Sequence, residues 1–161
     1  DNFISVMPNN LYGENDNYDL KNSHVLPALM SKIHKAKINN YKSVEIWGTG
    51  KPKREFLHVS DLADACVFIM KNLDASELYS NRISHINIGS GQEITIHDLA
   101  ILLTKVIGYN GSITFNKDMP DGMERKLLDC SRMRSLGWGP KIFLEEGLKN
   151  TYKWYLSQLD S

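Results

Sequence analysis

Apolar positions along the chain alternate between short extended runs and longer stretches with helical spacing. The helical stretches cover residues 25–37, 61–70, 96–107 and 144–159, and a short helix is predicted over 131–136. The runs typical of strands cover residues 3–7, 44–47, 55–59, 85–89 and 113–115. Helices that alternate with strands in this way predict the α/β class.

Residues that favour turns and caps mark several of the predicted ends. Ser23, Ser60 and Thr95 stand where an N-cap side chain would precede a helix. Residues 8–13, which contain Pro, Asn and Gly, predict a surface turn after the first strand. On the second helix the predicted apolar face comprises Leu62, Ala65, Cys66, Ile69 and Met70.

Two arrangements fit residues 44–59. Gly48, Thr49 and Gly50 form a strong turn signal between two extended runs. These runs either pair as a β-hairpin or are joined by a longer loop that contacts a ligand, and the sequence leaves both arrangements open. Residues 117–126 are polar and contain Pro and Gly, which predicts a second loop.

Composition and charge restrict the class of protein. With 161 residues and 42% hydrophobic content, the chain is expected to form one domain with a single core. Nineteen basic residues balance nineteen acidic ones, so no net field favours nucleic acid or an anionic membrane surface. No apolar run reaches the roughly 20 residues that span a bilayer. We therefore expect neither a nucleic-acid partner nor a membrane partner.

The cysteines and the start of the chain carry two further expectations. Cys66 and Cys130 are far apart and lack a paired spacing, which fits a reduced, cytoplasmic protein. The chain opens without Met, directly into the strand-like run at 3–7, as expected for part of a longer polypeptide. His58 and His85 lie within strand patterns and are expected to be structural, and no spacing typical of a metal site is visible.

Four segments carry a resemblance to a known family. Residues 8–13 (Pro-Asn-Asn-Leu-Tyr-Gly), 22–29 (Asn-Ser-His-Val-Leu-Pro-Ala-Leu), 47–61 (from Trp-Gly-Thr-Gly to Val-Ser-Asp) and 120–129 (from Pro-Asp-Gly to Leu-Leu-Asp) are similar to segments of the extended short-chain dehydrogenase/reductase family. The run Arg-Glu-Phe-Leu-His-Val by itself indicates a relative that modifies nucleotide sugars. The other segments narrow the resemblance to enzymes that act on GDP-linked sugars.

The resemblance implies which part of such an enzyme this is. Residues 1–161 correspond to the C-terminal, substrate-binding domain, with 2–7 and 84–89 as edge strands of a Rossmann sheet. The chain contains no Gly-x-x-Gly-x-x-Gly loop and no Tyr-x-x-x-Lys pair. The N-terminal cofactor-binding core and the catalytic Tyr-Lys dyad are therefore expected outside these residues.

The resemblance also implies an activity for the full-length parent. An NADP-dependent, homodimeric enzyme would convert GDP-4-keto-6-deoxy-D-mannose to GDP-L-fucose by epimerisation at C3 and C5 and reduction at C4. The portion described by this sequence would bind the GDP-sugar and be inactive alone. Two alternatives are a nucleotide-sugar 4-epimerase or 4,6-dehydratase and a non-catalytic nucleotide-binding module.

His24 is the candidate catalytic residue. Imidazole titrates near neutrality, and His24 stands at a polar junction between a loop and a helix. The resemblance assigns it the role of an acid that works with a cysteine base during epimerisation. The alternative is that His24 only caps the helix.

The remaining candidates would bind substrate and cofactor. Lys32, Arg54 and Lys126 are candidates to hold a diphosphate, and the alternative is that each is only solvated. The resemblance implies that Lys32 and Arg54 occupy positions that contact the GDP-sugar. Trp47 either packs against a ligand or belongs to the core, and Asp121 either accepts hydrogen bonds from guanine or ribose or stabilises a turn. The resemblance places the following residues against the nicotinamide end of NADP: Pro8, Asn9, Asn10, Leu11 and His24.

Overall fold

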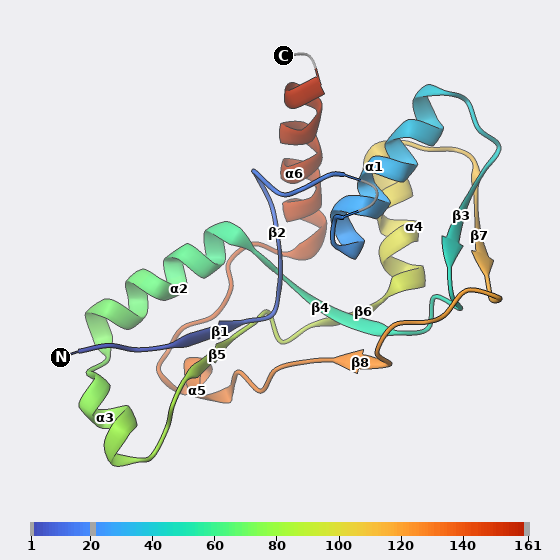
Figure 1. The fold of residues 1–161 in the computed structure, drawn as a ribbon. Coiled ribbons are helices and arrows are strands. Elements are labelled where there is room, and N and C mark those ends of the chain that lie inside the picture. Colours follow the sequence, from blue (N-terminus) through green and yellow to red (C-terminus); the bar gives the residue numbers. More distant parts are fainter. Residues whose placement is uncertain (1, 20–21, 160–161) are drawn as a thin grey trace.

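The computed structural model describes residues 2–19 and 22–159 and has a mixed α/β fold, as predicted (Figure 1). The helices are α1 (Val25–Ile38), α2 (Val59–Asn72), α3 (Ala75–Ser80), α4 (Ile96–Ile107), α5 (Ser131–Ser135) and α6 (Leu144–Leu159). The strands are β1 (Val6–Pro8), β2 (Asn10–Tyr12), β3 (Ser43–Trp47), β4 (Lys53–His58), β5 (Ile86–Ile88), β6 (Glu93–Thr95), β7 (Ser112–Asn116) and β8 (Arg125–Lys126). In the described part of the chain, no helix combines the length and apolar content needed to cross a membrane.

Strand pairing excludes the β-hairpin. β3 pairs in parallel with β7, and β4 pairs in parallel with β2 and β8 and antiparallel with β6. The backbone of the connecting loop bonds to other segments, since Asn116 O accepts from Gly48 N at 2.9 Å and Gly50 O accepts from His97 N at 2.9 Å. The hairpin arrangement is therefore wrong, and β3 and β4 are joined by a longer loop.

β4 contributes side chains to two separate hydrophobic cores. Successive side chains of a strand point to opposite faces, so Phe56 packs into one core and Leu57 into the other. The expectation of a single core is thus wrong, because the central strand is covered on both faces. In Figure 1 the helices divide accordingly, with α1, α4 and α6 on one side of β4 and α2, α3 and α5 on the other.

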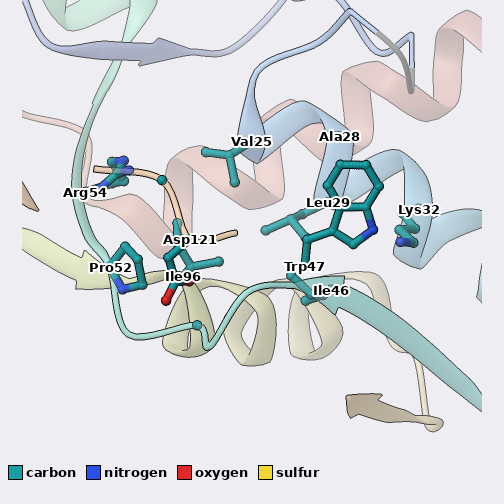
Figure 2. Close-up of a pocket in the computed structure, with 12 residues that line it drawn as sticks. Val25, Ala28, Leu29, Lys32, Ile46, Trp47, Pro52, Arg54, Ile96 and Asp121 are labelled. Atoms are coloured by element: carbon teal, nitrogen blue, oxygen red, sulfur yellow. The ribbon is translucent and has the colours of Figure 1, made fainter. Parts of the chain in front are cut away.

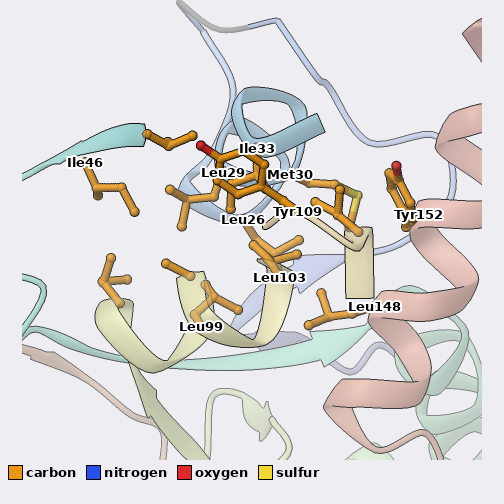
Figure 3. Close-up of a cluster of buried hydrophobic side chains, with 14 of the residues drawn as sticks. Leu26, Leu29, Met30, Ile33, Ile46, Leu99, Leu103, Tyr109, Leu148 and Tyr152 are labelled. Carbon is orange, nitrogen blue, oxygen red and sulfur yellow. The ribbon is translucent and has the colours of Figure 1, made fainter. Parts of the chain in front are cut away.

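The larger core is built where α1, α4 and α6 meet (Figure 3). α1 contributes Met30 and Ile33, which are completely buried, and α4 contributes Leu99 and Leu103. Leu148 of α6 closes this core with the apolar stripe predicted from the sequence. The smaller core comprises Leu57, Ala65, Ile69, Leu73, Leu78, Ile86, Ile88, Met133 and Trp138.

One of the three predicted helix caps is confirmed. The Thr95 side chain accepts a backbone N–H of the first turn of α4. At α2 the cap is His58, whose ring nitrogen accepts from Ser60 N at 3.3 Å, so Ser60 is not the cap. At α1 the cap position belongs to His24, and within residues 22–159 the buried Ser23 hydroxyl has no hydrogen-bond partner.

The predicted surface turn at 8–13 is wrong over its second half. Asn10–Tyr12 forms β2, which pairs with β4 opposite Phe56 and His58. Tyr12 is 1% exposed, and its ring lies 6.4 Å from that of Phe56 in an edge-on contact. Burial of this aromatic ring overrides the local turn preference of Pro, Asn and Gly.

Two other expectations concern surfaces. Met70 is 82% exposed, so it does not belong to the buried face of α2 as predicted. The buried residues of α2 are Asp61, Ala65 and Ile69, which are four positions apart. Of the segments predicted as strands at 2–7 and 84–89, only part is extended, as β1 (Val6–Pro8) and β5 (Ile86–Ile88). Over the described residues, these strands pair with each other and with no other strand.

His34 couples α1 to α6 through a buried polar contact. Its side chain is largely buried, and Nδ1 lies 3.0 Å from the hydroxyl of Tyr152. The ring also meets that of Tyr155 edge-on at 5.3 Å. Burial lowers the pKa of His34 below its ordinary value, and the charges of Lys37 and Lys35 lower it further.

Acidification should therefore weaken the contact between α1 and α6. Because the pKa of His34 is lower in the folded state, its neutral form is favoured there, and protonation favours unfolding. The free energy of unfolding should be unaffected by His34 titration above its ordinary pKa of 6.5, and it should fall as the pH drops below this value. In urea denaturation, we expect a smaller loss from pH 7.5 to pH 5.5 for His34→Gln than for the wild type. The exposed His85→Gln is the control, and an equal loss in His34→Gln would contradict this role.

Candidate functional site

Two cavities meet at Val25 and Arg54. The first, of about 420 Å³, lies between α1, the end of β3 and the loop that follows it. The second, of about 560 Å³, lies between residues 9–16, the start of α1 and β4. Both volumes fall in the range of small-molecule sites, which is about 300–1,000 Å³. Val25 and Arg54 border both cavities, so the two cavities are neighbours.

The first cavity has apolar walls with a few charged groups (Figure 2). The apolar part is formed by Val25, Ala28, Leu29, Ile46, Trp47, Pro52 and Ile96. Lys32, Arg54 and Asp121 supply the charges, and Gly122 brings the last loop close to the Arg54 guanidinium. Four of the five predicted substrate-binding residues therefore lie together: Lys32, Trp47, Arg54 and Asp121.

Trp47 is open to the cavity and to solvent. β3 buries Val44 and Ile46, and by strand alternation Trp47 falls on the opposite, exposed face. Its side chain is 63% exposed, and Figure 2 shows it beside α1. The core-packing alternative for Trp47 is therefore wrong.

Asp121 holds the turn that follows β3. Its Oδ1 accepts from Thr49 N at 2.8 Å, and its Oδ2 accepts from Thr49 Oγ1 at 2.6 Å. Gly48 has φ +83°, and a Cβ there would overlap the Asp121 carboxylate. The Thr49 hydroxyl, and then its N–H, lower the pKa of Asp121 below its ordinary value. Asp121 thus stabilises a turn, but this turn is the one around Thr49 and not the loop that contains Asp121.

The second cavity brings together most of the predicted cofactor residues. Asn9, Asn10, Leu11 and His24 border it, whereas Pro8 lies outside its lining. Lys126 joins this group instead of the first cavity, with Nζ donating to Asn10 Oδ1 at 3.2 Å. The reason is that β8, which lies in the segment predicted as a loop, pairs with β4.

His24 is exposed at the border of the second cavity. It occupies the N-cap position of α1, but in the described residues its side chain makes no capping hydrogen bond. The capping alternative therefore fails for the imidazole, which is available for other contacts. Asp16 borders the same cavity, and burial raises its pKa, opposed by the N–H of Asn17 and by the charge of His24.

Glu55 is a buried carboxylate that was not among the residues predicted for the site. It is 0% exposed, and its Oε1 accepts from Gly91 N at 2.5 Å. Its Oε2 accepts from Asn9 Nδ2 and, at 3.3 Å, from Leu128 N. Its own carbonyl accepts from Asn10 Nδ2 at 2.7 Å. The available signal was an acidic residue at the start of the strand-like run at 55–59.

Cys130 lies next to this carboxylate behind Gly89. A Cβ on Gly89 would overlap Glu55 Oε1 and come within 3.1 Å of Cys130 Sγ, so only glycine fits there. Burial, and then the charge of Glu55, raise the pKa of Cys130 to about 11. This thiol is therefore protonated at neutral pH. Within residues 2–19 and 22–159, no group of three or more His, Cys, Asp or Glu is arranged to hold a metal.

Comparison with known proteins places the chain in a family. The model of the NAD dependent epimerase/dehydratase family matches residues 1–89. The chain belongs to this family. The predicted resemblance to nucleotide-sugar enzymes is thereby confirmed at the level of the family.

Individual relatives show which members of the family this chain is similar to. GDP-L-fucose synthase 1 of Arabidopsis thaliana is 54% identical over 156 residues, which cover 97% of this chain and 46% of that protein. GDP-L-fucose synthase of Escherichia coli (strain K12) is 46% identical, with 98% of this chain and 50% of that protein covered. The solved structure of a GDP-D-glycero-L-gluco-heptose synthase from Campylobacter jejuni in the presence of NADPH is 40% identical, has a TM-score of 0.85 and covers 96% of this chain and 54% of that chain. The chain spans about half the length of the curated relatives it matches.

Replacing the buried carboxylate should cost stability in a specific way. Glu55→Gln places an amide N–H₂ among N–H donors, so the free energy of unfolding should fall by about 1–3 kcal/mol. Adding Asn9→Asp supplies an acceptor opposite that amide and should restore part of the loss. Urea denaturation of both variants and of the exposed Glu124→Gln, which should remain within about 0.5 kcal/mol, provides the measurement. A Glu55→Gln variant as stable as the wild type would refute the role of this network.

Proposed function

We propose that this chain is the GDP-sugar-binding portion of an NADP-dependent enzyme that converts GDP-4-keto-6-deoxy-D-mannose to GDP-L-fucose. The parent enzyme is proposed to be a cytoplasmic homodimer. The observation that carries the proposal is the meeting of Lys32, Trp47, Arg54 and Asp121 in one cavity. The 54% identity to an Arabidopsis GDP-L-fucose synthase supports the choice of substrate.

The first cavity suits the nucleotide half of the substrate. The exposed Trp47 plane offers a stacking surface for guanine, and the Asp121 carboxylate is an acceptor for the donors of its edge. Lys32 and Arg54 supply two positive charges for the diphosphate, and the guanidinium fork can bind phosphate oxygens in pairs. The sugar then extends toward the second cavity across Arg54, which borders both.

The second cavity suits the reacting sugar and the nicotinamide. Proton removal beside the C4 ketone gives an enolate, and returning a proton to the opposite face inverts C3 or C5. His24 borders this cavity and is the proposed donor of these protons. NADPH, when bound, supplies the hydride that reduces the ketone, and Asn9, Asn10 and Leu11 would contact its nicotinamide end. The buried, protonated Cys130 is unsuited to be the base.

A second candidate function is the conversion of a related GDP-sugar whose sugar has a different carbon chain. The Campylobacter jejuni GDP-heptose synthase is 40% identical over 96% of this chain, which favours GDP as the shared nucleotide. Under this alternative the nucleotide contacts are unchanged and the sugar differs. A UDP- or dTDP-sugar 4-epimerase or 4,6-dehydratase would instead require a different base in the first cavity.

Calorimetric titration tests the nucleotide site directly. The 161-residue chain should bind GDP more tightly than UDP or dTDP, because Asp121 faces a base edge rich in donors. Arg54→Gln and Lys32→Gln should each weaken GDP binding about tenfold, as expected for the loss of a charged hydrogen bond. Lys71→Gln on the exposed side of α2 is the matched control and should bind as the wild type does. Tighter binding of UDP would overturn the GDP assignment.

Turnover tests the role of His24. In the full-length parent, His24→Gln should reduce GDP-L-fucose formation by about 10²–10⁴-fold, the usual contribution of a general acid. Product formation is measured from the keto-sugar and NADPH, with His85→Gln as the control. The 161-residue chain alone should consume no NADPH. Unchanged turnover in His24→Gln would remove the proposed role, and protein-dependent NADPH consumption by the chain alone would contradict its inactivity.

A further inference from the structure

Thr49 is bound to Asp121 through both its backbone and its hydroxyl. The two carboxylate oxygens of Asp121 accept from Thr49 N at 2.8 Å and from Thr49 Oγ1 at 2.6 Å. The same hydroxyl oxygen accepts from Lys51 N at 3.2 Å, which leaves its proton directed at Asp121. One side chain thus links the loop backbone to a carboxylate at the border of the first cavity.

The loop around Thr49 is anchored without this hydroxyl. Asn116 O accepts from Gly48 N at 2.9 Å, and Gly50 O accepts from His97 N at 2.9 Å. Beyond the loop, Pro52 O accepts from Ile96 N at 3.0 Å. Removing the Thr49 hydroxyl should therefore leave the path of the loop intact.

The orientation of the Asp121 side chain depends on Thr49 more strongly than the path of the loop does. Asp121 is exposed and lies on an irregular segment between β7 and β8. In the described chain, both hydrogen bonds of its side chain come from Thr49. An exposed aspartate without these bonds would sample several rotamers, whereas the bonded one keeps a single orientation with unused lone pairs.

We propose that Thr49 is a positioning residue that orients the Asp121 carboxylate toward the amino and imino donors of guanine and so sets the preference of the first cavity for this base. The inference rests on the proposed binding of GDP. It adds that the preference depends on the hydroxyl of Thr49, a residue predicted only as part of a turn.

Paired nucleotides and paired variants test this role. Inosine diphosphate lacks only the 2-amino group of GDP, so calorimetry should give about tenfold tighter binding of GDP in the wild type. Thr49→Val removes the hydroxyl and should reduce this ratio to about threefold or less, whereas Thr49→Ser should preserve it. Thr114→Val, a matched change on the exposed face of β7, should also preserve the ratio. Thermal unfolding monitors the fold, and Thr49→Ala replaces Thr49→Val if valine disturbs the loop.

A measurement without ligand separates the two proposals. NMR titration of the Asp121 carboxyl should show a higher pKa in Thr49→Val than in the wild type, and an unchanged pKa in Thr49→Ser. The charge of Lys51 also lowers the pKa of this carboxyl, and neither variant alters Lys51. Failure of the wild type to bind GDP would overturn the proposed function, while the titration would still decide whether Thr49 holds Asp121. An Asp121 pKa and a nucleotide ratio that are both unchanged in Thr49→Val would overturn the positioning role.

Discussion

The carboxylate of Glu55 is the constraint on which the arrangement of the site depends. A buried carboxylate is stable only if N–H donors replace its water shell. In this protein the donors come from Asn9, Gly91 and Leu128, which are far apart in the sequence. Satisfying one charge therefore fixes three segments around β4. One of these segments leads into β2 and the border of the second cavity.

The position of Glu55 on β4 relates the fold to the site. Glu55 and Leu57 point to the face of the smaller core, and Phe56 points to the larger one. Arg54 shares the face of Phe56 and reaches both cavities. Neighbouring positions of β4 thus hold Glu55, a buried charge that ties segments together, and Arg54, a charge that borders both cavities.

Local placement of charge explains how a protein without net charge can offer an anion site. Acidic and basic residues are equal in number, so long-range attraction of a nucleotide is weak. Lys32 and Arg54 come from α1 and β4 and meet only in the folded chain. Asp121 borders the same cavity, but its charge is already engaged by two donors from Thr49. The basic groups therefore border a cavity together with a single carboxylate, which Thr49 holds in place.

The sequence by itself determined the features that depend on neighbouring residues. The spacing of apolar side chains predicted the helices α1, α4 and α6. Thr95 marked the start of α4, because a capping side chain acts over a few positions. The segments that carry the family resemblance likewise contain Trp47, Arg54 and Asp121, which meet in the first cavity.

Only the tertiary structure decided which segments meet. The pairing of β3 with β7, the burial of Tyr12 in β2 and the placement of Lys126 beside Asn10 each depend on partners far along the chain. Local patterns report backbone preference and the side of an element that is buried. They do not report the partner, since long-range pairing is set by the packing of the whole core and by buried groups such as Glu55, whose hydrogen bonds form only after the fold has brought their donors together.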